Sequence, residues 1–156
     1  MNDDYQEWYK NHHKEVGRFW TTVQVNDENK ATYLVSLLLE AISNKAEDRI
    51  NFLIDTAFEI ENELIQIVAL NELLVIKEHQ RHQEITKSLQ NFAHPSSVDY
   101  IKTVLEGSFD HLDYNCSDSD VIAKWFSHAL SRIGTEDAID IIKKYANSSD
   151  EGIKHE

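Results

Sequence analysis

The stretch SHALSRIGTEDAIDIIKKYANSSDEGIK, residues 127–154, decides how the fold of this chain is interpreted. Its helical apolar pattern stops at Ile133 and Gly134, restarts within four residues, stops again at NSSD and then restarts once more. A single pair of helices needs only one such interruption. The repeated stops and starts therefore predict a stacked array of helix pairs.

An earlier segment carries the same pattern. HQEITKSLQNFAHPSSVDYIKTVL aligns without a gap with AKWFSHALSRIGTEDAIDIIKKYA at a constant offset of 41 positions. The matched pairs are Ile85 and Phe126, Leu89 and Leu130, Phe92 and Ile133, Val98 and Ile139, Asp99 and Asp140, Ile101 and Ile142, and Lys102 and Lys143. The motif restarts at Ile153, 31 positions after Ile122, so we expect a basic unit of about 31 residues, within the range of helical repeats. The extra residues of SFDHLDYNCSDSD then form an insertion on one rim of the array, which is often the binding rim.

Composition limits the class of protein. The chain has 156 residues and a net charge of −13, with only 4 Gly and 1 Pro. So few turn-forming residues predict an all-α protein, and the length fits one domain over residues 1–156. The negative charge argues against a nucleic-acid or membrane partner and favours a basic protein. One cysteine, no signal-peptide pattern and no apolar run of membrane-spanning length predict a cytoplasmic protein.

The 3.6-residue apolar period predicts helices over residues 3–22, 29–43, 46–60, 62–78, 82–93, 95–108, 119–133 and 136–147. The segment EHQRHQ is open to two interpretations, a turn or the continuation of one long helix. Residues 3–22 carry an aromatic stripe and suit a capping helix at the N-terminal end of the array. We therefore expect a cap and a divergent helix pair in residues 1–60, and helical repeats in 61–156, clearest at 82–108 and 118–147.

Residues that could carry chemistry are sparse. His79 and His82 lie three positions apart beside two glutamates, but no second cluster supplies further metal ligands, so a solvated polar turn is expected there. One of the adjacent His12 and His13 is expected to be half-buried against Trp8 and Val16, because neighbouring residues of a helix point in different directions. Cys116 lies among aspartates that disfavour a thiolate. No nucleophile elbow or phosphate-binding loop is present, so we expect no enzymatic activity, no cofactor and no metal.

The segment SDSDVIAKWFSHALSRIGTEDAIDIIKKYANSSDEGIK resembles a HEAT repeat of the phycobilisome-lyase type. The shared elements are an Asp-rich start, a first helix ending in Ala-Leu-x-x-Ile-Gly, a short acidic turn and a second helix that begins Glu-Asp-Ala-Ile. The resemblance extends less closely to residues 82–108. It implies a short right-handed solenoid of antiparallel helix pairs, in which the second helices line the concave face.

Acidic residues gather in two segments, 45–72 and 97–120, and each segment has a local charge of −5. They are either ordinary solvated helix faces or parts of one acidic surface that stacked repeats bring together. Tyr114, in the acidic insertion, is a candidate interface anchor. The predicted partner-binding residues are Asp48, Asp55, Glu59, Asp99, Glu106, Asp110, Asp113, Tyr114, Asp118 and Asp120.

Small acidic helical proteins of this appearance resemble the immunity proteins of bacterial contact-dependent inhibition and other polymorphic toxin systems. That resemblance implies a protein that neutralises a basic toxin, such as a nuclease, by covering its active-site cleft. Two other interpretations stay open. In one of them, the chain is an adaptor or scaffold module for another protein. In the other, which follows from the phycobilisome-lyase resemblance, it is a subunit of a chromophore-attaching enzyme.

Overall fold

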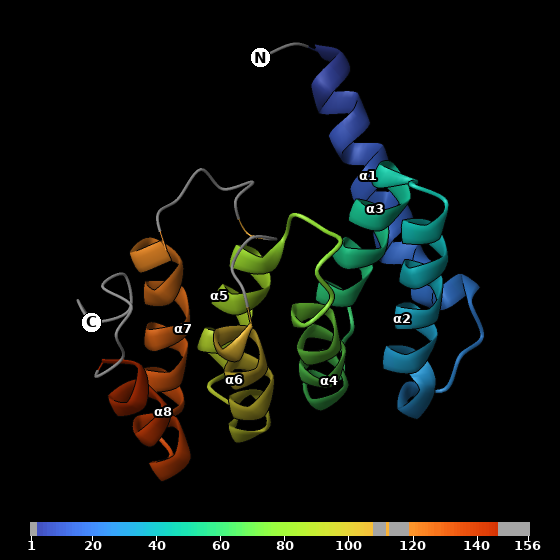
Figure 1. Ribbon diagram of the computed structural model, residues 1–156. Helices are drawn as coiled ribbons and strands as arrows, with labels where there is room; N and C mark the ends of the chain where they lie inside the picture. The colour runs from blue at the N-terminus through green and yellow to red at the C-terminus, as the bar shows by residue number, and fades with distance from the viewer. Residues whose placement is uncertain (1–2, 108–111, 113–118, 147–156) are drawn as a thin grey trace. The chain divides into compact units, whose positions relative to one another are not determined.

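The computed structural model describes residues 3–107, 112 and 119–146, and all regular secondary structure in these residues is helical. The elements shown in Figure 1 are α1 (Asp3–Thr22), α2 (Asp27–Ser43), α3 (Glu47–Phe58), α4 (Glu63–Leu74), α5 (His82–Phe92), the 3₁₀ turn η1 (Pro95–Ser97), α6 (Val98–Glu106), α7 (Ser119–Ile133) and α8 (Glu136–Ala146). The all-α class is therefore confirmed. Among the described helices, none combines the length and the apolar composition needed to cross a membrane.

Helix boundaries match the predicted ones to within a few residues, with two informative differences. The helix expected over 62–78 is α4, which ends at Leu74, so EHQRHQ does not continue this helix. Its first four residues belong to the connection between α4 and α5, and its last two, His82 and Gln83, begin α5. The helix expected over 95–108 begins as the 3₁₀ turn η1, with Pro95 at its first position. Proline is well suited to that position, because the first N–H groups of a helix have no partner within it.

The chain divides into two compact units, which we call the N-terminal unit (Met1–Ala69) and the C-terminal unit (Leu70–Glu156). The division falls within α4, whose sequence runs on without a break from one unit to the other. The expected internal boundary, between residues 60 and 61, lies at the turn that precedes this helix. The single domain predicted from length stays a prediction.

In the N-terminal unit, α3 packs against both α1 and α2. Leu34 and Leu38 of α2 and Leu53 and Ile54 of α3 are fully buried and form the core of this unit. From α1, the Trp20 indole N–H donates a hydrogen bond of 2.8 Å to the backbone carbonyl of Thr56. The C-terminal half of α1 is thus attached to α3 by packing and by a polar contact. The capping role expected of this helix stays a prediction.

In the C-terminal unit, α7 packs against α5, α6 and α8. Phe126 of α7 is fully buried and is among the largest side chains of this core. The C-terminal half of α4 belongs to the same unit, and two polar contacts join it to the helices that follow. The Asn71 amide donates to the Ser96 hydroxyl at 3.3 Å, and the Tyr100 hydroxyl donates to a Glu72 carboxylate oxygen at 2.8 Å.

The first helices of the two aligned pairs end in the same way. Ala93 after α5 and Gly134 after α7 are 41 positions apart, and both have left-handed backbone angles, with φ of 52° and 68°. Their amide groups donate to the carbonyls of Leu89 and Leu130, each at 2.9 Å. This is the common way to end a helix, and glycine is the usual residue there because it has no Cβ to clash.

The second helices begin alike as well. The His94 Nδ1 accepts a hydrogen bond of 3.2 Å from the Ser96 amide, and the Thr135 hydroxyl accepts one of 3.2 Å from the Ala138 amide. His94 and Thr135 are again 41 positions apart. A side chain that accepts from the first free amides of a helix fixes where that helix begins. The sequence correspondence between the two pairs therefore extends to their backbone geometry.

Candidate partner-binding surface

The predicted partner-binding residues are distributed over both units. Asp48, Asp55 and Glu59 belong to α3 and its C-terminal end in the N-terminal unit, and Asp99 and Glu106 belong to α6 in the C-terminal unit. Asp120 lies in the first turn of α7. The other four, in the insertion, lie outside the described residues, as does Cys116: they are Asp110, Asp113, Tyr114 and Asp118.

On α3, the three predicted carboxylates have different environments. Asp48 and Glu59 are exposed, whereas Asp55 is only partly exposed and already has a partner within the chain. The His12 Nε2 of α1 lies 2.7 Å from an Asp55 carboxylate oxygen. A partner protein that used Asp55 would have to compete with this contact. Of the three, Asp48 and Glu59 are therefore the ones that α1 leaves accessible.

The His12 environment also settles one of the sequence predictions. His12 is half-buried and His13 is exposed, so the expectation that one of the two would be half-buried is confirmed. The His12 ring meets the Phe52 ring edge to face, with the centroids 5.8 Å apart. The helical rotation between neighbouring residues turns one imidazole toward α3 and the other toward solvent.

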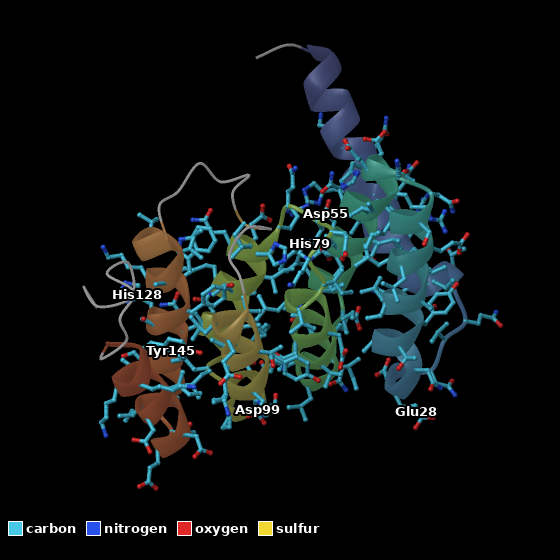
Figure 2. The ribbon with its side chains drawn as sticks, viewed as in Figure 1. Glu28, Asp55, His79, Asp99, His128 and Tyr145 are labelled. Atoms are coloured by element: carbon cyan, nitrogen blue, oxygen red, sulfur yellow. The ribbon has the colours of Figure 1, made fainter. Side chains whose placement is uncertain are left out.

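A groove lies between α6 and α8 in the C-terminal unit. Its volume is about 410 Å³, and it is lined by Val98, Asp99, Lys102, Asp137, Asp140, Ile141 and Lys144. Asp99, labelled in Figure 2, lies in the first turn of α6. The fold thus places one predicted binding residue, Asp99, beside two aspartates of α8, Asp137 and Asp140, that were not among the predicted binding residues.

Repeat alignment could have identified one of these two residues. Asp140 is the equivalent of Asp99 at the offset of 41 positions, so side chains at the same place in two successive pairs line the same groove. Asp137 has no acidic equivalent in the first pair, where Ser96 stands. Only the packing of α6 against α8 shows that Asp137 belongs to the groove.

The charge of the groove is mixed, with a small excess of carboxylates. Across the two helices, Lys144 Nζ lies 3.1 Å from a Glu106 carboxylate oxygen, and on α8 Lys143 lies 3.2 Å from Asp140. The hydrogen bond that Lys144 donates to the Glu106 carboxylate raises the pKa of Lys144, which keeps this amine charged. These pairs are solvent-exposed and exposed ion pairs are weak, so an incoming arginine or lysine can displace them. Asp99 and Asp137 have no ion pair within the described part of the chain.

His79 and His82 form a buried pair, so the expectation of a solvated polar turn is wrong. The two residues are only 5% and 0% exposed, and their rings stack with centroids 4.0 Å apart. The His79 Nε2 lies 2.9 Å from the Leu73 carbonyl, and the His82 Nε2 lies 2.9 Å from the Ile76 carbonyl. The histidines therefore satisfy carbonyls at and just beyond the C-terminal end of α4, where a helix has no partners of its own.

The hydrogen bonds also define the protonation state of His79. A carbonyl can only accept, so the His79 Nε2 carries a proton, while the Nδ1 accepts from the Arg81 amide at 3.1 Å. This ring is thus neutral, with both nitrogens in hydrogen bonds. Within residues 3–107, 112 and 119–146, no three side chains of His, Cys, Asp or Glu are grouped so that they could hold a metal ion.

Comparison with models of known protein families, with curated protein sequences and with solved structures finds no match for this chain.

Proposed function

We propose that this protein binds a basic protein through the α6–α8 groove and acts as an inhibitor of that partner, in the manner of a bacterial immunity protein. One observation carries the proposal. Asp99, Asp137 and Asp140 face a single groove, where they outnumber the two lysines, Lys102 and Lys144, and the lining also includes the apolar side chains of Val98 and Ile141. Such a lining suits an arginine or lysine side chain, because the carboxylates meet its charge and the apolar residues meet its aliphatic stem.

The overall charge supports the same class of partner. At −13, the protein attracts a basic surface over several ångströms and repels nucleic acid. A nuclease binds phosphates in a basic cleft, so an acidic protein that occupies the cleft excludes the substrate. We propose that the carboxylates of the groove meet lysines or arginines of that cleft. Rigid helices hold these groups in place before binding, which limits the entropy lost on association.

For the scaffold, we infer a short right-handed HEAT-like solenoid that begins with α1 as its cap. Support comes from the two aligned helix pairs, which share buried positions in their first helices (Ile85 with Phe126, and Leu89 with Leu130), their left-handed helix ends and the place where their second helices begin. In such an array, successive second helices lie side by side, and α6 and α8 are second helices in contact. The groove between them then belongs to the surface that solenoids use for binding.

The test starts with the tagged protein in a bacterial cell that carries its native gene neighbourhood. We expect capture of a stoichiometric basic protein at low salt, with weaker capture at high salt, identified by mass spectrometry. The purified partner should degrade nucleic acid, and this activity should stop when the acidic protein is added. Recovery of a subunit of a housekeeping complex, or of a pigment-bearing protein, would instead support the adaptor or the lyase-like interpretation.

Variants then locate the interface. Asp99→Asn combined with Asp140→Asn should weaken partner binding by about tenfold or more, since removing one member of a charge pair in an interface leaves the other charge unpaired. The control combines Glu15→Gln with Glu40→Gln, two exposed residues of α1 and α2, and changes the net charge by the same amount. Equal effects of the two double variants would mean that the groove is not the binding site.

A further inference from the structure

Helix α4 has an unusual distribution of apolar residues for a helix with an exposed side. Its sequence is ELIQIVALNELL, and apolar residues occur all around the helix. A helix that is apolar on every side is normally buried on every side. Here Ile67 and Ala69 are buried, but Leu64 is 58% exposed and Val68 is 44% exposed.

These two residues differ from the other exposed apolar side chains. Among the described residues, Leu39, Val121 and Ile139 are also exposed, but each stands alone on its helix. Single exposed apolar residues are normal on any protein surface. Leu64 and Val68 are four positions apart, so they lie one turn apart on the same face and form a continuous apolar strip.

Carboxylates lie directly beside this strip along the chain. Glu59 and Glu61, in the turn that leads from α3 into α4, and Glu63, the first residue of α4, are all exposed. In the described part of the chain, none of them takes part in an ion pair. The turn has a defined geometry, because the Asn62 side chain accepts a hydrogen bond of 3.3 Å from the Ile65 amide at the start of α4. The three glutamates thus flank the apolar strip along the chain, in or beside an ordered turn, and none of them has an ion pair within the described residues.

We propose that this corner of the N-terminal unit, formed by Leu64, Val68, Glu59, Glu61 and Glu63, is a docking surface for a basic amphipathic helix of another protein. We call it the α3–α4 corner. Apolar side chains of the incoming helix cover Leu64 and Val68, and its lysines or arginines meet the three glutamates. Charge complementarity decides between this occupant and a second copy of the chain. Two copies facing each other here would bring six unpaired carboxylates together, in a protein whose net charge is already −13.

The α3–α4 corner lies in a different unit from the α6–α8 groove, and this proposal does not depend on the function proposed for the groove. The probe is a fluorescein-labelled amphipathic peptide of leucines and lysines, with all leucines on one face of the helix. A second peptide of the same composition, scrambled so that both residue types surround the helix, measures non-specific attraction to the acidic protein. Fluorescence anisotropy of the full-length protein with each peptide gives the two dissociation constants.

The apolar contact is tested with Leu64→Gln combined with Val68→Thr. We expect the dissociation constant of the amphipathic peptide to rise about tenfold, because the apolar contact at the centre of the surface is lost. The control is Leu39→Gln on α2, which alters a leucine of similar exposure, 48%, and should change the constant less than about twofold. The proposal is overturned if the α4 double variant binds the peptide as well as Leu39→Gln does.

The charge contact is tested independently, with Glu61→Gln combined with Glu63→Gln. These changes leave the buried residues of α4 intact, so folding is preserved even if the apolar variant is destabilised. We expect a larger loss of affinity than Glu15→Gln combined with Glu40→Gln produces, and the excess should disappear at high salt. Equal losses of affinity in the two double variants would contradict the proposal. Dimerisation of the wild-type protein that Leu64→Gln abolishes would also contradict it, because a second copy of the chain would then occupy the surface.

Discussion

The first helix pair (α5 and α6) and the second pair (α7 and α8) share a sequence pattern, yet equivalent residues differ in exposure. Ile85 and Phe126 are both fully buried, whereas Val98 is 6% exposed and its equivalent Ile139 is 42% exposed. Within the C-terminal unit, α6 has a neighbour in α8 and also contacts the C-terminal half of α4 through Tyr100. The same apolar position is therefore core in one pair and surface in the next, because burial depends on what packs against it.

The largest effect is expected from the shared core position of the two pairs. Replacing Phe126 by alanine should lower the free energy of unfolding by about 3–5 kcal/mol, and replacing Ile85 should lower it by about 2–5 kcal/mol, because each change leaves a cavity. Urea denaturation followed by circular dichroism measures both losses. A loss below about 1 kcal/mol for either variant would show that the two positions are not equivalent core sites.

The next effect concerns a position where the pairs differ in residue type. His82 of α5 is the equivalent of Ala123 of α7, and both are buried. His82→Ala makes the first pair resemble the second, but it leaves the Ile76 carbonyl without its partner and removes the stack with His79. We expect a loss of about 2–4 kcal/mol in the free energy of unfolding.

Hydrogen exchange should locate that loss at the C-terminal end of α4, where amide protection decreases in His82→Ala. Ala123→Gly is the matched change in the second pair, and it should cost only about 1 kcal/mol, the usual effect of glycine inside a helix. If His82→Ala costs no more than Ala123→Gly, the histidine stack contributes nothing to stability.

Substitutions at the left-handed ends of α5 and α7 should have smaller effects on the free energy of unfolding, of opposite sign in the two pairs. Gly134→Ala should lower the free energy of unfolding by about 1 kcal/mol, because alanine is strained at a φ of 68°. A Cβ there would approach the Ser131 carbonyl only to 3.6 Å, an ordinary contact, so the cost is conformational and not steric crowding. Ala93→Gly should raise the free energy of unfolding by up to about 1 kcal/mol. Changes of the same sign in the two variants would show that the two helix ends are not equivalent.

The smallest expected effect is a dependence of stability on pH. It concerns Tyr100, which can ionise, whereas its equivalent in the second pair, Ile141, cannot. The hydrogen bond to Glu72, more than burial, raises the pKa of Tyr100 above 10.0. The neutral phenol is therefore favoured in the folded state. Its contribution to stability is complete below pH 10 and is lost as the pH rises through the pKa of the folded state.

Melting curves between pH 8 and pH 11 test this assignment. The Tyr100→Phe variant should lose less stability than the wild type over the alkaline part of this range, because it has no phenol to ionise. Other titrating groups, including Tyr145, whose pKa is raised mainly by burial, are common to both proteins and cancel in the difference. Parallel curves for the two proteins would show that the Tyr100–Glu72 contact does not influence stability.

Much of the fold could be predicted from the sequence because its signals are local. The period of 3.6 residues, the Gly134 stop and the position of Pro95 placed most helix boundaries to within a few residues. The end of α4 was harder to predict from the sequence, since the EHQRHQ segment that follows it is polar in composition. Histidine next to glutamate and glutamine is typical of a solvated turn, and only the path of the chain shows that its two imidazoles stack in the interior.

The candidate site was less predictable, because a site depends on contacts between residues far apart in the sequence. Asp99 could be selected from local charge, whereas Asp137 joins it only through the packing of α6 against α8. Asp55 appeared equivalent to Asp48 and Glu59, yet its carboxylate contacts His12, which is 43 residues away. Charge patterns identify acidic segments but not which of their carboxylates are already engaged.

By itself, the sequence determined the helical class, the repeated pair at an offset of 41 positions and the strong negative charge, because periodicity, helix-ending residues and net charge are properties of local sequence and composition. Tertiary structure decided the burial of His79 and His82, the pairing of His12 with Asp55 and the groove between α6 and α8. The physical reason is that burial and hydrogen-bond partners are set by distance in space. Residues distant in sequence come together only when the helices pack.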